Sequence, residues 1–320
     1  MQFADNVDYP RLISRPAVYV PGLIATFALL TWFHIGPTSL VNGFGSWSLS
    51  PALTAPLSAL IITAALALNI VAILRLNLRT QVYVVWIELA VLVLCFFYSF
   101  DLSFSFIRRK LYFLITQGLV TTLYISAVSI LIASVLALIG AIAKLSNNGI
   151  ALGIANFYTS LFRGLPLLMQ IYMIYLGLPQ LGYVIGAVPA GIAALSLCYG
   201  AYMTEIFRAG IESIPRGQWE ASRALGIKPT DTLRRIILPQ AMRIIIPPTG
   251  NQFIAMLKDS SLVSVVGVWE LMYLARTQGQ TEFRHVEMMI TASMIYWIMS
   301  AVLELGQARL ERFYNRAHQR

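Results

Sequence analysis

The chain has 320 residues, of which 58% are apolar and only 12% are charged. Soluble domains carry roughly 25% charged residues, so this composition excludes an ordinary soluble domain and indicates a chain built for an apolar solvent. The net charge of +9 does not indicate nucleic-acid binding, because the Lys and Arg residues gather at the ends of apolar runs, where they act as topology signals.

Apolar runs long enough to cross a bilayer as helices, at roughly 20 residues each, recur along the chain. They lie at 17–33, 56–74, 82–100, 116–143, 157–176, 188–207, 244–268 and 288–305. None of them alternates apolar and polar residues as the strands of a membrane barrel do. The sequence therefore predicts an all-α integral membrane protein with about eight transmembrane helices.

The positions of Lys and Arg predict which side of the membrane each connection occupies. With the N-terminus inside, most basic residues fall in the predicted cytoplasmic segments, above all in the connection 208–243 and the tail 309–320. Both termini are therefore predicted to be cytoplasmic. The cluster Arg108–Lys110 is discordant, and its aromatic-rich surroundings at 104–113 favour an amphipathic helix on the outer surface.

The predicted helices divide into two groups by their polar content. The first three carry almost no polar residue at membrane depth apart from Asn69 and Glu88, whereas the last five carry many. Polar groups inside a membrane are costly and usually face a cavity or a partner helix. We therefore expect an accessory region with three helices at 1–112, a five-helix transport core at 113–308 and a basic cytoplasmic tail at 309–320.

The most unusual stretch of the sequence is the basic connection between the sixth and seventh predicted helices. Pro215 suits the first turn of a helix, and Gly226 suits the left-handed residue that ends one. Thr230 or Asp231 can then cap a second short helix that ends before Pro239. An Arg-rich helical hairpin between two membrane spans is a docking surface rather than a reaction site.

Within this connection, at about 209–243, the sequence resembles the signature loop of permease subunits in ABC-type importers. That loop reads E-A-A-x3-G-x9-I-x-L-P, and only its second alanine differs here, because Ser222 stands in its place. Composition alone favours an ordinary basic connector, so the spacing carries the resemblance. It assigns docking of a separate ATPase subunit to these residues: Gly217, Glu220, Ala221, Ser222, Gly226, Ile236, Leu238 and Pro239.

Three further segments narrow the resemblance to the polar amino acid permeases, which handle histidine, glutamine, glutamate, arginine and opines. These segments are 161–168, 202–210 and 257–263, and the likeness covers roughly 118–312. The simplest members of that family have five spanning helices, so the three N-terminal helices are an addition found in only some relatives. The resemblance implies a permease subunit of the bacterial inner membrane that imports polar amino acids.

The resemblance also implies a division of labour among several proteins. Two permease subunits form the pathway, two ATP-binding subunits attach to their cytoplasmic loops, and an extracytoplasmic binding protein delivers the amino acid. ATP and Mg²⁺ belong to the ATP-binding subunit, so no cofactor is expected in this chain. The sequence agrees, because it contains no G-x-x-x-x-G-K-[ST] phosphate loop, and no catalytic residue is expected.

Charged and polar residues of the core are candidates for the pathway or its gate. Glu205 and Arg208 lie on one helical face, which fits a gate, a brace for the loop or an interfacial ion pair. The consecutive prolines at 247–248 predict a broken helix. Beyond them, Lys258 and Asp259 fit either a pathway wall or a structural pair. The candidates are Arg163, Gln170, Glu205, Arg208, Asn251, Lys258, Asp259 and Ser260.

Other interpretations stay open, although fewer features support them. A related ABC importer for another small solute would share the same loop. A secondary carrier or channel would need coupling-ion carboxylates near the midplane or an internal repeat, and a membrane-embedded enzyme would need a paired acid, base or nucleophile. Cys95 and Cys198 lie in apolar runs, so neither a disulfide nor a metal site is expected. The sequence does not indicate which amino acid is carried or whether the two permeases are identical.

Overall fold

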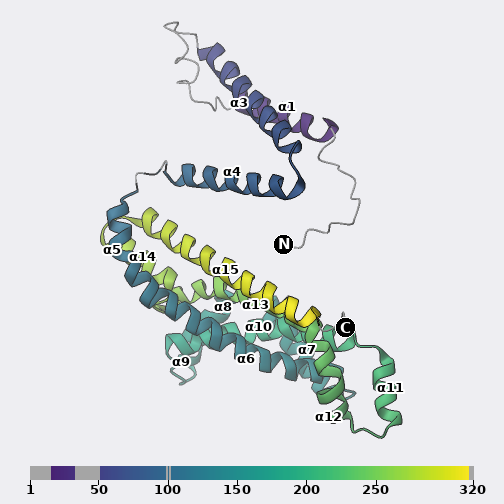
Figure 1. Ribbon diagram of the computed structural model, residues 1–320. Coiled ribbons are helices and arrows are strands. Elements are labelled where there is room, and N and C mark those ends of the chain that lie inside the picture. Colours follow the sequence, from purple (N-terminus) through teal and green to yellow (C-terminus); the bar gives the residue numbers. More distant parts are fainter. Residues whose placement is uncertain (1–15, 33–50, 99, 101, 317–320) are drawn as a thin grey trace. The chain divides into compact units, whose positions relative to one another are not determined.

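The computed structural model describes residues 16–32, 51–98, 100 and 102–316, and this part of the chain contains helices and no strand (Figure 1). The predicted all-α class is therefore confirmed. The chain consists of two compact units, residues 1–101 and residues 102–320.

The N-terminal unit contains the helices α1 (Pro16–Trp32), α3 (Pro51–Leu74) and α4 (Leu78–Tyr98). α1 packs on α3. The Asn69 side chain of α3 donates a hydrogen bond of 2.7 Å to Glu88 Oε1 of α4, so these two polar side chains are paired with each other. No residue of α4 is buried, and its apolar side chains are exposed all round, as expected for a helix that contacts lipid.

The C-terminal unit is a helical core in which α6 and α10 make the most extensive contact. Three of its segments are π-helical (η1, η2 and η3) and one is a 3₁₀ helix (η4). In chain order its elements are α5 (Phe104–Phe113), η1 (Leu114–Leu119), α6 (Val120–Leu145), α7 (Gly149–Gly164), α8 (Leu167–Tyr172), η2 (Met173–Gly177), α9 (Leu178–Gln180), α10 (Ala187–Glu212), α11 (Arg216–Ala224), α12 (Pro229–Asp231), η3 (Thr232–Ile237), α13 (Leu238–Asp259), η4 (Ser260–Val266), α14 (Leu271–Thr281) and α15 (His285–Arg316).

Small residues allow α6 and α10 to approach closely. A Cβ atom on Gly140 of α6 would lie 2.6 Å from Thr204 Oγ1 of α10, which is closer than real Cβ atoms come. Ala133, Ala137 and Ala141 of α6 are fully buried beside the same helix pair. Helices in a membrane associate by such close packing rather than by a hydrophobic driving force. The α6–α10 pair is thus the rigid frame on which the polar side chains of the core are mounted.

The count of eight transmembrane helices is not confirmed. Five helices of the described chain are long and apolar enough to cross a membrane: Pro56–Leu74, Leu78–Tyr98, Phe104–Leu145, Ala187–Glu212 and His285–Arg312. A sixth span is possible if the bent pair Gly149–Gly164 and Leu167–Gln180 counts as one. The apolar part of α1, Val20–Thr31, is shorter, and α13 carries too many polar residues to count by composition alone.

The span predicted at 157–176 is not one continuous helix, because the chain bends by 106° between α7 and α8. Pro166 explains the bend. Proline disfavours helical backbone at the residue before it, and Leu165 is accordingly extended, with φ −89° and ψ 138°. Gly164 has open space around it and adds no side chain to oppose the turn.

The helix expected at 104–113 is present as α5, but it is not a separate element. α5, η1 and α6 form one helix of 42 residues, so the predicted domain boundary at 112 falls inside a continuous element. No proline interrupts this stretch, and the π-helical turns of η1 absorb the irregularity. The discordant basic cluster has acidic partners here, since Arg109 and Lys110 lie 3.5 and 3.2 Å from the Glu282 carboxylate.

Candidate functional site

The hairpin segment, residues 215–239, begins with the nine-residue helix α11 and a glycine turn. Gly226 has φ +67°, as predicted for the left-handed residue after a helix. The Ile227 N–H donates to the Ser222 carbonyl and the Gly226 N–H to the Arg223 carbonyl, both at 3.0 Å. These two bonds form a Schellman motif, which closes the helix and fixes the direction in which the chain leaves it.

One face of α11 is held by the core and the other is exposed. Ser222 is buried, and its hydroxyl donates to the Gln218 carbonyl at 2.7 Å, while Trp219 packs against the core cluster. Glu220 and Ala221 are exposed, and Leu225 is 77% exposed although it is a large apolar residue. α11 and α12 lie at one end of the core, beyond the end of α10 (Figure 1). An exposed face of this kind, anchored from behind, is suited to contact another protein.

The second helix of the segment differs from the prediction. It begins at Pro229, one residue after Lys228, rather than with a cap at Thr230 or Asp231, and it does not end before Pro239. Instead α12, η3 and α13 follow one another without a gap. Proline lacks an N–H and its ring crowds the carbonyl of the preceding turn, and the wider π turns of η3 accommodate both effects. The segment is therefore continuous with the membrane helix α13.

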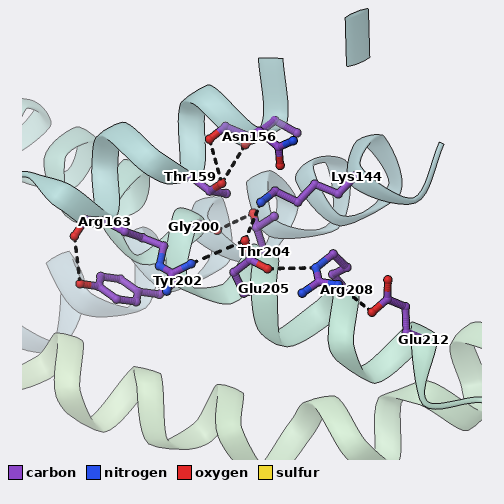
Figure 2. Close-up of polar contacts among 11 residues, drawn as sticks. Lys144, Asn156, Thr159, Arg163, Gly200, Tyr202, Thr204, Glu205, Arg208 and Glu212 are labelled. Carbon is purple, nitrogen blue, oxygen red and sulfur yellow. Dashed lines mark hydrogen bonds and ion pairs between the residues drawn. The ribbon is translucent and has the colours of Figure 1, made fainter. Parts of the chain in front are cut away.

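A cluster of charges surrounds Glu205 at the end of α10 that leads into the hairpin segment (Figure 2). Lys144 of α6 makes the shortest contact with its carboxylate, and Arg208 Nε lies 3.0 Å away. The Arg163 guanidinium of α7 lies farther off, at 3.6 Å. Arg208 also contacts Glu212 at 2.7 Å. The predicted pair of Glu205 and Arg208 is thus present, but it belongs to a larger Glu205 cluster that joins three helices.

A polar cavity of about 460 Å³, the bend cavity, lies beside the turn between α7 and α8. Asp259 Oδ2 accepts a hydrogen bond of 2.7 Å from the Tyr199 hydroxyl on its wall. The bend cavity therefore presents a carboxylate from α13 and a guanidinium from α7, the two charges that recognise a zwitterion. The residues other than glycine, leucine and proline that line it are Arg163, Cys198, Tyr199, Tyr202, Gln252 and Asp259.

Helix α13 runs through the prolines at 247–248, so the predicted break there is wrong. The two prolines remove two helical hydrogen bonds, but α15 supports this turn, since Gln307 Nε2 donates to the Pro247 carbonyl at 3.0 Å. The α-helix ends only at Asp259, where η4 begins. Lys258 is exposed and makes no ion pair with any residue that the structure describes. Neighbouring residues on a helix point about 100° apart, which explains why Asp259 contacts Tyr199 while Lys258 does not.

Of the eight predicted candidates, only Arg163 and Asp259 line the bend cavity, and Gln170, Asn251 and Ser260 make other contacts. Gln170 is buried, and its amide donates to the carbonyls of Phe162 and Leu165, both at 2.9 Å, so it holds the bend between α7 and α8. The Asn251 side chain accepts from Gln307 of α15 at 3.0 Å. Ser260 donates to the Leu257 carbonyl within its own turn. Conversely, Tyr199, Tyr202 and Gln252 line the bend cavity but were not among the candidates predicted from the sequence.

Glu270 is a further residue that was not predicted from the sequence. Its side chain is fully buried and caps α14, accepting from the N–H groups of Met272 and Tyr273 at 2.8 and 2.7 Å. The Tyr296 hydroxyl of α15 donates to the same carboxylate at 2.8 Å. Glutamate is not a favoured capping residue, so this role is not predictable from the residue type. Glu270 holds together two helices of the core.

Replacing Glu270 by alanine should destabilise the purified protein clearly. The change removes a cap, worth about 0.5–2 kcal/mol, and leaves a buried hydroxyl unpaired, at a cost of about 1–3 kcal/mol. Thermal unfolding in detergent measures the effect. Glu282→Ala is the matched control, because Glu282 is partly exposed and exposed ion pairs contribute only about 0–1 kcal/mol. Equal stability of the two variants would contradict the capping role.

A helical core with several candidate membrane spans, a polar cavity that carries charges of both signs and an exposed helical hairpin at one end fits a membrane transport subunit. Residues 135–316 match the model of the family described as the binding-protein-dependent transport system inner membrane component. The chain belongs to this family, and the resemblance seen in its hairpin segment is confirmed.

Characterised relatives match over most of their length. The chain is 38% identical over 213 residues to the arginine transport system permease protein ArtQ of Bacillus subtilis (strain 168), covering 66% of this chain and 97% of that protein. It is 36% identical over 216 residues to the L-cystine transport system permease protein TcyB of the same organism, covering 67% and 92%. The matches leave about a third of this chain uncovered.

Solved structures agree with the fold. A crystal structure of an amino acid ABC transporter with histidines matches with a TM-score of 0.61 and 34% identity, covering 66% of this chain and 99% of that one. An inward-facing structure of the MetNI methionine ABC transporter matches with a TM-score of 0.56, covering 64% and 98%. At 22% identity, this second match supports the fold alone.

Proposed function

We propose that the chain is the membrane-spanning permease subunit of an ABC importer that carries polar amino acids into the cytoplasm. The exposed face of α11 carries the proposal. It presents Glu220 and Ala221 of the signature loop on a helix whose direction is fixed by the Gly226 turn. Ser222, which replaces the usual alanine, points inward and makes only a local hydrogen bond, so the exposed face keeps the pattern of the signature.

The partner of this face is a separate ATP-binding subunit. That subunit holds ATP and Mg²⁺, while this chain contributes no cofactor and no catalytic group. Of the eight residues assigned to docking, Gly217, Glu220, Ala221 and Gly226 lie on the exposed part of the segment. Ile236, Leu238 and Pro239 lie where η3 joins α13, and they transmit a movement of α11 into a membrane helix because the backbone there is continuous. A second permease subunit and an extracytoplasmic binding protein complete the importer.

The substrate class rests on the bend cavity and on the relatives. Asp259 suits the ammonium group of an amino acid and Arg163 its carboxylate, since Arg binds carboxylates in a bidentate manner. Arginine and cystine are carried by the systems to which the named relatives belong. A secondary carrier would need an internal repeat or carboxylates that bind a coupling ion. The helices that the structure describes show no such repeat, so this alternative has less support.

The hairpin segment and its link to α15 support an assignment of the cytoplasmic side. ATP is available only in the cytoplasm, so the hairpin segment faces it. Gln307, near the C-terminal end of α15, contacts Pro247 in the half of α13 nearer to the hairpin segment. The C-terminal end of α15 is therefore cytoplasmic, in a multi-pass protein of the bacterial inner membrane, and we place the N-terminus on the same side from the distribution of basic residues.

Co-expression with a candidate ATP-binding subunit from the same organism tests this function. We expect the two proteins to copurify in detergent and to hydrolyse ATP together, with no hydrolysis by this chain alone. Stimulation by the amino-acid-loaded binding protein is expected in addition. Steady hydrolysis by the pure chain, or failure of the two subunits to associate, would contradict the proposal.

A further inference from the structure

The two polar cavities of the core meet at Arg163. The second cavity, of about 480 Å³, is here called the charged cavity, and its wall includes Lys144, Asn156, Thr159 and Ser160. It adjoins the Glu205 cluster (Figure 2). Both cavities are lined by Arg163, Gly164 and Tyr202, although their remaining walls differ. The Arg163 side chain therefore lies at the boundary that the two cavities share.

Arg163 is the most loosely held cation of the Glu205 cluster. Its guanidinium lies 3.6 Å from the Glu205 carboxylate, beyond hydrogen-bonding distance, whereas Arg208 lies at 3.0 Å and Lys144 closer still. The Arg163 side chain is 43% exposed, against 9% for that of Lys144. Glu205 therefore keeps two partners if Arg163 leaves it, so the movement leaves no buried charge unpaired.

The backbone around Arg163 also allows the side chain to turn. Arg163 is the last residue but one of α7, directly before the 106° bend, and nothing lies within 4 Å of the position where Gly164 would carry a side chain. The guanidinium stacks over the Tyr202 ring at 5.4 Å, and Tyr202 also lines both cavities. The ring gives the cation a surface over which it can move while staying partly neutralised.

We propose that Arg163 is the gate between the bend cavity and the charged cavity, and that the carboxylate of an entering amino acid opens it by replacing Glu205 as the partner of the guanidinium. Lys144 and Arg208 hold Glu205 in place while Arg163 is away. A carboxylate ligand forms two parallel hydrogen bonds with a guanidinium, which Glu205 at its present distance does not. In naming an amino acid as the ligand, the gate rests on the proposed function.

Thiol modification from the hairpin side measures this gate. The assembled importer is placed in inside-out vesicles after Cys95→Ser and Cys198→Ala remove both native thiols. Gln252→Cys then reports on the bend cavity and Ser160→Cys on the charged cavity, with an impermeant, positively charged methanethiosulfonate as the probe. In the resting importer we expect the thiol at position 252 to react slowly and the one at position 160 to react fast.

The two gate partners should give matching results. Arg163→Ala and Glu205→Gln should each speed modification at position 252 by roughly tenfold, because both release the guanidinium from its closed position, and neither should change the rate at position 160. Lys144→Gln is the matched control. It takes a different cation from the same carboxylate, leaves Arg163 in place and should not speed modification at position 252. Arg163→Lys keeps the charge but loses the bidentate geometry, and should leave the cavity closed while weakening uptake.

Two outcomes would overturn the gate. One is an unchanged rate at position 252 in both Arg163→Ala and Glu205→Gln. The other is an equal increase in Lys144→Gln, which would mean that the cluster only holds the helices together. If the unsubstituted importer neither hydrolyses ATP nor takes up amino acids, the proposed function fails instead. The modification rates still decide the gate in that case, because they depend on access to the cavity and not on turnover.

Discussion

Replacing Gly226 by proline should abolish most ATP-driven uptake while the protein still inserts and folds. Proline fixes φ near −65°, whereas Gly226 has φ +67°, and proline also removes the N–H that bonds to the Arg223 carbonyl at 3.0 Å. Both changes destroy the Schellman motif, so α11 points in another direction. Loss of the docking contacts of α11 should cost at least about 1–2 kcal/mol of binding free energy. This corresponds to a loss of roughly tenfold or more in affinity for the ATP-binding subunit.

Lys228→Pro is the matched control for this variant. It places the same residue two positions further along the same turn, at a backbone φ of −62° that proline requires. It should therefore retain most of the uptake, which is measured with labelled amino acid in vesicles together with the amount of inserted protein. Glu220→Lys, which reverses a charge on the exposed face, should resemble Gly226→Pro. Normal uptake by Gly226→Pro would show that α11 does not transmit the action of ATP.

Replacing Asp259 by asparagine should lower uptake by roughly 10- to 100-fold with only a small loss of folded protein. Asparagine has nearly the same shape and still accepts the hydrogen bond from Tyr199, but it cannot attract the ammonium group of an amino acid. Hydrogen bonds to charged groups contribute about 1.5–3 kcal/mol, which gives this range. Tyr199→Phe removes the hydroxyl but keeps the carboxylate, and should lower uptake less.

Lys258→Met separates this account from a structural ion pair. Breaking a buried pair costs about 3–5 kcal/mol, so a structural pair would lose folded protein in both single variants and recover it in the double variant. The structure places Lys258 on an exposed surface with no ion-pair partner among the described residues. We therefore expect Lys258→Met to leave folded yield nearly unchanged and the double variant to transport as poorly as Asp259→Asn. Recovery of yield and uptake in the double variant would contradict the role of Asp259 in the bend cavity.

Local sequence signals predicted those features that depend on a few neighbouring residues. The αL turn at Gly226 follows from the absence of a Cβ atom, and the helices α3, α4 and α10 follow from long apolar runs. The Glu205–Arg208 pair follows from a spacing of three residues on a helix. The docking role of the hairpin segment was predicted only from the family resemblance, because composition alone does not distinguish the segment from a basic connector.

Features that depend on distant residues were not predictable in this way. The sequence pointed to a break at the prolines 247–248, but a contact from α15 supports that turn. Lys144 and Glu205 are 61 positions apart in the chain, so no local sequence pattern predicts their contact. The bend cavity likewise gathers its wall from α7, α8, α10 and α13, and Gln170, which looked like a wall residue, instead holds the bend. Tertiary packing decides these features.

Uptake by a fully reconstituted importer tests the central claim most directly. Proteoliposomes would contain this chain and its ATP-binding subunit, with the binding protein outside and ATP inside, and labelled arginine, glutamine and cystine would be offered in turn. The account predicts uptake of at least one polar amino acid only when both subunits, the binding protein and ATP are all present. Uptake by the chain alone under an ion gradient, or uptake indifferent to ATP, would contradict it.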